Sequence, residues 1–213
     1  MTPHPRRYGG VSAADRRTQR RTQLIDALFT CLTTRSVDEI TLRLVTAEAG
    51  LNARYVYEEF GGLDGFIRAG YETAVGQFRD HIDGALGADV DETADDVAVI
   101  VSAICTFVER QQHKARLIVV DSLKVPALSD RRKQAIDHFT GAFARRLGAQ
   151  RAYAHIPRDQ LALTARFLVG ATGEVIVGTI DHSVPGTPTT HVPALTALFT
   201  GALSQRSSTA PTD

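Results

Sequence analysis

Residues 41–60 read TLRLVTAEAGLNARYVYEEF, and this stretch carries the strongest signal for secondary structure in the chain. Thr41 precedes an amphipathic segment, and its hydroxyl can cap a helix by accepting a hydrogen bond from an unpaired backbone N–H. Gly50 ends the segment, because glycine adopts the left-handed conformation that closes a helix without a Cβ penalty. Leu51 can fill the core between two helices, and Asn52 can cap a second helix. The stretch therefore predicts two short helices joined by a tight turn.

A helix, a glycine-containing turn and a second helix make up the helix-turn-helix layout, in which the second helix enters the major groove of DNA. By spacing alone, an ordinary pair of antiparallel helices is the alternative. In the second helix Val56 and Phe60 share one face and are expected in the core. The residues left for the other faces are Ala53, Arg54, Tyr55 and Tyr57. Arginine can form hydrogen bonds with guanine edges and tyrosine can reach phosphate, so this composition favours a DNA-binding helix over an ordinary helix pair.

Two acids at the far end of the second helix oppose this interpretation. Glu58 and Glu59 would repel the DNA backbone if they faced it. We therefore expect both side chains to point away from DNA.

Residues 41–66, TLRLVTAEAGLNARYVYEEFGGLDGF, resemble the DNA-binding signature of the tetracycline-repressor-like (TetR) transcriptional regulators. The resemblance covers about residues 20–70. The family's positions are matched by Thr41, Gly50, Tyr57 and Phe60, by the apolar Leu42, Val45, Leu51 and Val56, and by Asn52 in place of the capping serine. The resemblance implies a DNA-binding set of Thr41 and Tyr57 on phosphate, Arg43, Ala53, Arg54 and Tyr55 in the groove, and Asn52 at the helix start.

The sequence also departs from the TetR pattern. Leu63 stands where the family has a lysine at the start of the fourth helix, and Thr46 replaces a small alanine that faces the turn. Glu58 and Glu59 occupy positions that are often histidine in the family. A variant pattern within the family, RY.YE.F..LD, is closer to this chain. The departures remove phosphate-binding charge, so the N-terminal arginines are expected to supply more of the electrostatic affinity.

The charge distribution agrees with a cationic N-terminal region. The whole chain has a net charge of zero, but residues 1–60 hold nine arginines and seven acids, a balance of +2, which leaves −2 for the rest. Within the first 21 residues there are six arginines and a single acid, Asp15. A basic arm therefore precedes and enters the first helix.

Helical periodicity continues along the chain, without a convincing alternating strand. We predict an all-α fold, with an N-terminal three-helix helix-turn-helix domain and a C-terminal helical ligand-binding and dimerisation domain. The predicted boundaries are 1–62 for the basic arm and DNA-binding domain, 63–205 for the effector-binding and dimerisation domain, and 206–213 for a disordered polar tail. The β-branched run at 115–123 could form a strand, but its place between helices favours a helix.

Small residues recur in the last two helices. They are Ala165, Gly170, Ala171, Gly173 and Gly178 on one helix, and Ala194, Ala197, Gly201 and Ala202 on the other. Such residues cost helix propensity but allow backbones to approach closely. Tight packing within one subunit is one explanation. The TetR resemblance implies instead a homodimer, in which these two helices of each chain form a four-helix bundle.

Several protein classes are not expected. The seven histidines show no HxxxH or HExxH spacing, and neither cysteine is close to one of them, so we expect no metal site. GATGE at 170–174 lacks the lysine and hydroxyl residue of a phosphate loop. We therefore expect no cofactor and no enzyme. Since no secretory signal and no membrane-spanning run is evident, we expect a cytoplasmic protein without a membrane partner.

The resemblance further implies that a small apolar effector binds inside the C-terminal domain. Ligand sites combine apolar walls with a few polar groups. By that criterion the candidates are Phe78, His81, Ser102, Phe107, Asp121, His138, Arg166 and Glu174, each of which could equally be a core or surface residue. Arg166 and Glu174 are eight residues apart on one helix face, and a buried charge there would need a partner, such as the second subunit.

Two functions follow from these observations. The first is a homodimeric transcriptional regulator, a repressor that a mostly apolar effector releases from a palindromic operator in double-stranded DNA. The alternative is a helical ligand-binding or scaffold protein with a degenerate helix-turn-helix, which Leu63, Glu58 and Glu59 would favour. A continuous positive face around Arg16, Arg20, Arg43 and Arg54 distinguishes the first from the second.

Overall fold

The computed structural model describes residues 12–87 and 96–204, and all regular structure within these ranges is helical. The α-helices are α1 (Ala13–Leu32), α2 (Leu42–Ala49), α3 (Arg54–Phe60), α4 (Leu63–Ala85), α5 (Asp96–Arg110), α6 (Gln112–Val119), α7 (Ser129–Ala149), α8 (Arg158–Ile180) and α9 (Val192–Ser204). Short 3₁₀ turns are η1 (Val37–Glu39), η2 (Asp121–Leu123), η3 (Pro126–Leu128) and η4 (Pro188–His191). The predicted all-α fold is confirmed. The arm up to residue 11 and the predicted tail 206–213 lie outside the described residues.

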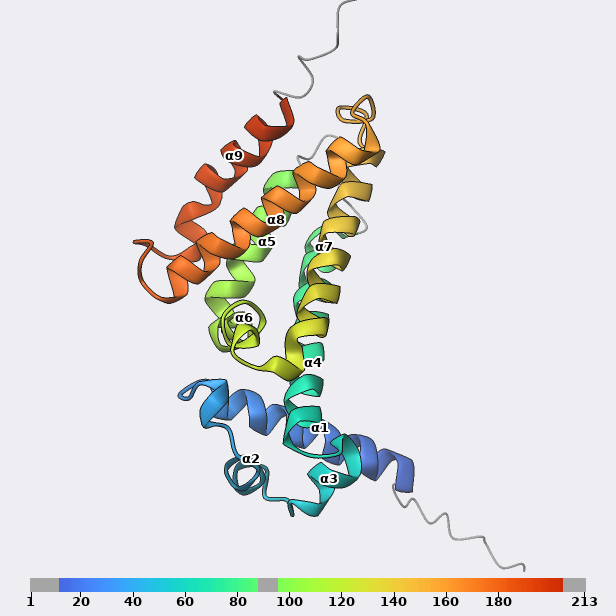
Figure 1. Ribbon diagram of the computed structural model, residues 1–213, viewed down its shortest axis with the longest axis vertical. Coiled ribbons are helices and arrows are strands. Elements are labelled where there is room, and N and C mark those ends of the chain that lie inside the picture. Colours follow the sequence, from blue (N-terminus) through green and yellow to red (C-terminus); the bar gives the residue numbers. More distant parts are fainter. Residues whose placement is uncertain (1–11, 88–95, 205–213) are drawn as a thin grey trace, which may run out of the picture.

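The helices form two groups that α4 connects. Figure 1 shows α1, α2 and α3 gathered at one end, with α4 running from that end into the larger group formed by α5–α9. α8 and α9 lie toward the opposite end. The run at 115–123, which could have been a strand, is helical in α6 and η2.

α1 begins at a reciprocal cap. The Ser12 hydroxyl accepts from the Asp15 N–H at 3.0 Å, and the Asp15 carboxylate accepts from the Ser12 N–H at 3.2 Å. This arrangement satisfies two donors that a helix start leaves unpaired. The first three turns of α1 are mostly exposed, and only from Leu24 onward does the helix bury one face. Its arginine-rich half therefore projects along the surface of the small domain.

The core of the small domain includes residues from beyond the predicted boundary at residue 62. Val45 of α2 and Val56 of α3 are fully buried beside Phe66 of α4. Leu117 of α6 and Leu128 of η3 complete the same core, although they lie more than fifty residues further along the chain. The N-terminal half of α4 and the α6 region therefore support the end of the molecule that holds α1, α2 and α3.

A second core holds the larger group together. α5 is central, as its apolar composition predicts, with Val97 and Val101 almost fully buried. Leu147 of α7, Leu168 of α8 and Leu203 of α9 pack in the same core. The larger domain is thus a bundle built around α5.

The sequence predicts no segment that could span a membrane, but α8 meets the length and composition for one, with a mean hydropathy of 1.5. In the structure it packs against α7 and α9 and carries Arg166 and Glu174 at exposed positions. Its apolar character serves helix packing on one side and leaves an exposed apolar face on the other.

The junction of α3 and α4 depends on one close approach. A Cβ atom at Gly65 would lie 1.9 Å from the Phe60 carbonyl oxygen, whereas a Cβ at Gly76, on the same helix, would meet nothing within 4 Å. We expect Gly65→Ala to lower the free energy of unfolding by about 1–3 kcal/mol, the usual cost of a steric overlap. Gly76→Ala should instead raise it by about 0.5–1 kcal/mol, because alanine favours helix. Urea unfolding of the two variants compares them directly, and equal stabilisation by both would contradict this view of the junction.

Candidate DNA-binding surface and ligand cavity

The helix-turn-helix has the caps that the sequence predicts. The Thr41 hydroxyl accepts from the Leu44 N–H at 3.2 Å at the start of α2. Gly50 ends α2 in the left-handed conformation, with φ of 62°. The residue directly before α3 is Ala53, and the Asn52 side-chain oxygen, one position earlier, accepts from the Arg54 N–H at 2.9 Å and so caps the first residue of the helix. The turn between the helices is fixed by local hydrogen bonds on both sides.

Thr46, a departure from the TetR pattern, fits the turn without an unpaired hydroxyl. Its side chain is buried, and the hydroxyl donates to the Leu42 carbonyl at 2.7 Å within α2. The Thr46 carbonyl accepts from the Leu51 N–H at 3.0 Å, which closes the helix end. The substitution therefore leaves the turn geometry intact.

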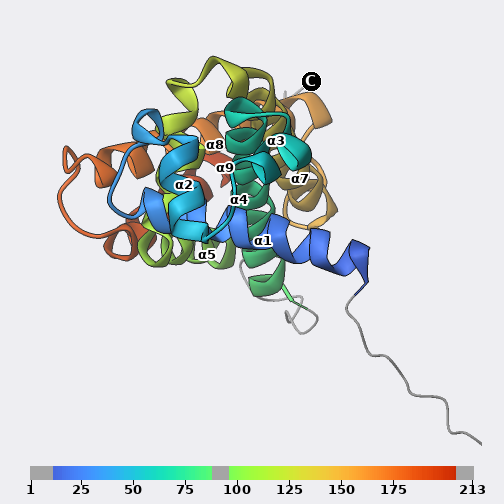
Figure 2. The same ribbon diagram turned by 90° about the horizontal axis from the view of Figure 1, so that it is seen from below.

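α3 presents two of the predicted DNA-binding side chains to solvent. The side chain of Arg54 is 77% exposed, and Tyr57 is 59% exposed. Thr41 and Arg43 are also exposed near the start of α2. Figure 2, which views the molecule from below, shows α1, α2 and α3 together at this end. These elements form a surface that a nucleic acid can approach.

Tyr55 lies differently from its neighbours. Its ring is half-buried against the core of the small domain, and the Arg20 guanidinium stacks on it, 4.7 Å from the ring centroid. Arg21 stacks in the same way on Phe60, at 4.6 Å. Successive residues of a helix are rotated by about 100°, so Tyr55 turns toward α1 while Arg54 faces outward. The ring of Tyr55 thus supports α3 against α1, and this placement does not favour the predicted groove contact.

The two glutamates of α3 are each paired with an arginine. Glu59 accepts from Arg17 of α1 at 2.8 Å, and its side chain is only 6% exposed. Glu58 forms an ion pair with Arg54 one turn earlier, and this hydrogen bond raises the pKa of the Arg54 guanidinium. Glu59 therefore points inward, as expected, whereas Glu58 shares the exposed side of α3 with Arg54.

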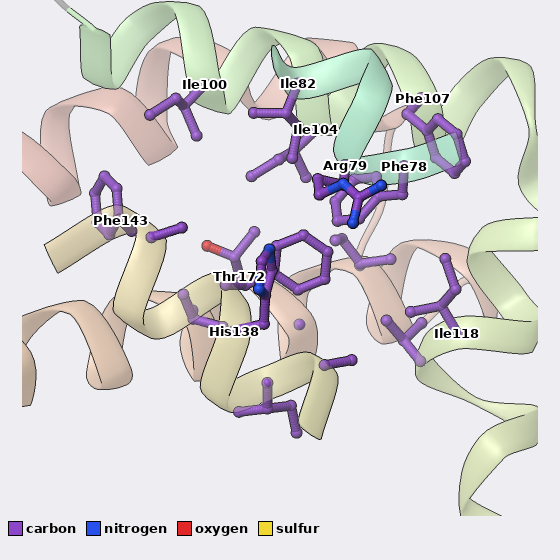
Figure 3. Close-up of a pocket in the computed structure, with 18 of the residues that line it drawn as sticks. Phe78, Arg79, Ile82, Ile100, Ile104, Phe107, Ile118, His138, Phe143 and Thr172 are labelled. Carbon is purple, nitrogen blue, oxygen red and sulfur yellow. The ribbon is translucent and has the colours of Figure 1, made fainter. Parts of the chain in front are cut away.

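A cavity of about 770 Å³ lies inside the larger domain, bounded by α4, α5, α6, α7 and α8. Its walls are mainly aliphatic and aromatic. The Phe78 ring lies 5.0 Å from that of Phe107 and 5.2 Å from that of Phe139. Figure 3 shows Ile82, Ile104 and other apolar side chains around the space, with His138 among them. The volume and lining suit a mostly apolar small molecule.

Five of the eight predicted ligand residues line this cavity: Phe78, Phe107, His138, Arg166 and Glu174. His81 instead lines a smaller adjoining pocket of about 280 Å³, which shares Phe107 with the large one. Residues that the prediction missed include Tyr71, Ile82, Ile100, Ile104, Phe143 and Thr172. Most of these have the periodicity of ordinary core residues, so the sequence carried no signal that set them apart.

Two predicted ligand residues lie away from the cavity. Ser102 is exposed on the solvent side of α5. Asp121 is almost fully buried in η2, where Arg116 Nε lies 3.5 Å and Lys124 Nζ lies 4.0 Å from its carboxylate. Burial raises the pKa of Asp121, and the two cations oppose this rise. Neither residue lines the cavity, so the structure does not bring them together with the other predicted ligand residues.

Arg166 has its partner within the same chain. Its guanidinium donates to Asp137 of α7 at 2.7 Å, and both side chains are about half exposed. The expectation of a buried charge that needs the second subunit is wrong for this residue. The pair lies at the rim of the cavity and joins α7 to α8.

An exposed apolar face covers parts of α8 and α9. Leu163, Phe167 and Leu198 are 63%, 66% and 66% exposed. A Cβ atom at Gly170, Gly173 or Gly201 would meet nothing within 4 Å, so packing within the chain does not require glycine there. Gly178 differs, because its Cβ would lie 2.6 Å from Val184 Cγ2. Packing within one chain thus accounts for Gly178 and for the fully buried Ala165, but not for glycine at 170, 173 and 201.

No protein-family model and no curated protein matches the sequence, but many solved structures share its fold. A TetR-like transcriptional regulator from Rhodococcus sp. RHA1 is 15% identical, with a TM-score of 0.67 over 92% of this chain and 99% of that one. The fatty acid degradation regulator FadR from Bacillus halodurans is 14% identical, with a TM-score of 0.73 over 86% and 96%. The multidrug binding protein EbrR, complexed with imidazole, is 20% identical, with a TM-score of 0.66 over 99% and 100%. The chain therefore has the fold of the TetR-like regulators.

The cap of α3 gives a test of this local structure. Asn52→Ala removes the oxygen that accepts from the Arg54 N–H, so the free energy of unfolding should fall by about 1 kcal/mol. Asn52→Ser keeps an acceptor at the same position and should remain close to the parent protein. Urea unfolding measures both, and an alanine variant as stable as the serine variant would show that the cap is not used.

Proposed function

We propose that this protein is a homodimeric DNA-binding transcriptional regulator, a repressor that leaves a palindromic operator when a mostly apolar molecule fills the cavity. The observation that carries the proposal is the capped helix α3, which exposes Arg54 and Tyr57 at the end of the molecule opposite α8 and α9. A recognition helix of this kind reads base edges in the major groove. The cytoplasm, where the protein would reach DNA, is its proposed location.

The roles of individual residues follow from their positions. Thr41 and Tyr57 are proposed to contact phosphates, and Arg43, Ala53 and Arg54 to face the groove. Asn52 acts through the cap of α3. Tyr55 acts indirectly, by holding α3 against α1 through Arg20. The exposed arginines of α1 add the cationic charge that phosphate binding requires.

The structures that share the fold support the regulatory part of the proposal. Two of them are described as a TetR-like transcriptional regulator and a regulator of fatty acid degradation. A third is described as a multidrug binding protein and holds imidazole. A chain with the same fold and a cavity of about 770 Å³ is suited to the same combination of DNA binding and ligand binding.

The alternative, a scaffold protein without DNA affinity, loses its main support. Glu59 is turned inward to Arg17, and Glu58 is neutralised by Arg54. Leu63, which replaces a lysine of the TetR pattern, packs against the core of the small domain. The acids therefore do not dominate the surface of α3.

The exposed apolar face on α8 and α9 supports the dimer. Isolated apolar residues on a surface are common, but three large ones beside glycines with open space above them suit a second helix pair. A two-fold axis through this face would bring α8 and α9 of both protomers together. It would also set the two α3 helices against successive major grooves, about one helical turn apart.

The ion pair of Arg54 makes DNA binding testable. If Arg54 reads a base edge, Arg54→Ala should weaken binding by roughly 10- to 100-fold and relax preference at particular bases. Glu58→Gln should strengthen binding, because it removes negative charge and frees Arg54. Arg151→Ala, an exposed arginine between α7 and α8, is the control and should bind normally. Fluorescence anisotropy with DNA fragments selected from the native genome measures all three. An equal loss for all sequences would assign Arg54 to phosphate, and no loss would contradict the proposal.

The dimer has its own test. Phe167→Glu places a charge in the exposed apolar face and should convert the protein to monomers, because an unpaired charge in an interface costs several kcal/mol. Leu123→Glu, at a leucine that is 62% exposed outside that face, should leave the dimer intact. Sedimentation velocity measures the oligomeric state. A parent protein that sediments as a monomer, or a Phe167→Glu dimer, would rule out this interface.

A further inference from the structure

One polar residue on the cavity wall, Tyr71, makes no hydrogen bond through its hydroxyl among the residues that the structure describes. This residue belongs to α4 and is only 2% exposed. A phenol hydroxyl can donate one hydrogen bond and accept another. A ligand atom in the cavity could therefore accept a hydrogen bond from Tyr71.

Arg132 of α7 lines the same cavity and is half-buried. Among the described residues no carboxylate lies within 4.0 Å of it, whereas its neighbour Arg131 pairs with Glu72 at 2.9 Å. Burial raises the pKa of Tyr71 to about 12, and the nearby charge of Arg132 acts against that rise. The Tyr71 hydroxyl is therefore protonated at neutral pH. The ion pair of Glu72 with Arg131 brings the adjacent residues Tyr71 and Arg132 to the same junction of α4 and α7.

The other charged groups of the cavity leave this end positive. Three lining arginines are already paired: Arg79 with Asp80 at 3.1 Å, Arg146 with Asp96 at 2.9 Å, and Arg166 with Asp137 at 2.7 Å. The two lining acids are Asp83 and Glu174. Asp83 follows Tyr71 by twelve residues on α4, about 18 Å along the axis, and Glu174 is exposed. The end of the cavity beside Tyr71 thus offers donors and positive charge.

We infer that Tyr71 and Arg132 form a subsite for a carboxylate, and that the effector is an amphipathic acid. Its head group would accept from the Tyr71 hydroxyl and from the planar Arg132 guanidinium, a pairing that suits carboxylates. Its apolar tail would lie along Ile82, Ile100 and Ile104 on the walls of the cavity. This inference rests on the proposed function, in which the cavity holds an effector.

The position of the subsite also connects it to the DNA-binding end. Tyr71 belongs to the core of the small domain, together with Phe66 and Leu117. A head group bound at Tyr71 would therefore act on α4 at the place where the two cores meet. A ligand bound only by its tail would touch α4 more than a turn further on, at Phe78 and Ile82.

The test compares ligands that differ only in the head group. Isothermal titration calorimetry of the full chain without DNA would use decanoate, 1-decanol and decylamine. Since a hydrogen bond to a charged group contributes about 1.5–3 kcal/mol, decanoate should bind about 10-fold or more tighter than 1-decanol. Tyr71→Phe and Arg132→Gln should each lower decanoate affinity by about 10-fold. Unchanged binding of 1-decanol by both variants would show that they still fold.

Arg145→Gln is the matched control, because Arg145 also lines the cavity and has no carboxylate within 4.0 Å among the described residues. It should keep the preference for decanoate. Equal affinity for decanoate and 1-decanol, failure to bind either, or an equal loss in Arg145→Gln would overturn the subsite. If decanoate and 1-decanol release DNA equally well, the proposed function is supported and the carboxylate subsite is contradicted. If decanoate binds more tightly than 1-decanol but does not affect DNA binding, the subsite is supported and the proposed function is contradicted.

Discussion

The structure depends on α4, a single continuous helix that contributes residues to the core of the small domain and to the cavity wall of the larger one. Phe66 is buried with α1–α3, Phe78 and Ile82 face the cavity, and Tyr71 between them does both. The helix has 23 residues, roughly 35 Å, and a helix of this length transmits a displacement along its axis because its backbone hydrogen bonds resist bending. α6 provides a second connection, since Leu117 packs in the first core and the adjacent Ile118 lines the cavity. In the proposed function, a ligand that displaced α4 or α6 would therefore act on helices that also pack against the helix-turn-helix.

The charges around the helix-turn-helix are paired locally. A chain with no net charge can still bind phosphate if its cations are exposed and its acids are occupied. Arg17 holds Glu59 against α1, and Arg20 stacks on Tyr55, so two arginines fix the orientation of α3. Arg54 remains exposed while it pairs with Glu58, and DNA would have to compete with that carboxylate for the guanidinium.

What the sequence predicted well was set by local chemistry. Thr41, Gly50 and Asn52 act on backbone groups a few residues away, so their identities were enough to predict the turn. The cavity could not be predicted in this way. The sequence does not show whether a polar side chain on a helix faces the interior or the solvent. In the structure His138 lines the cavity, whereas Ser102 faces solvent. The partner of Arg166 is Asp137, 29 positions away, and only the packing of α7 on α8 brings them together. Ile100 and Ile104 line the cavity but have the helical spacing of core residues, because the wall of an apolar cavity and a packed core both require apolar side chains that face inward.

A reciprocal titration tests whether the cavity and the proposed DNA-binding surface are coupled through α4. DNA affinity would be measured with the cavity empty and filled, and ligand affinity with and without DNA. We expect the ligand to weaken DNA binding, and DNA to weaken ligand binding by the same factor, because linkage requires equal effects. A ligand that binds in the cavity and leaves both affinities unchanged would contradict this coupling.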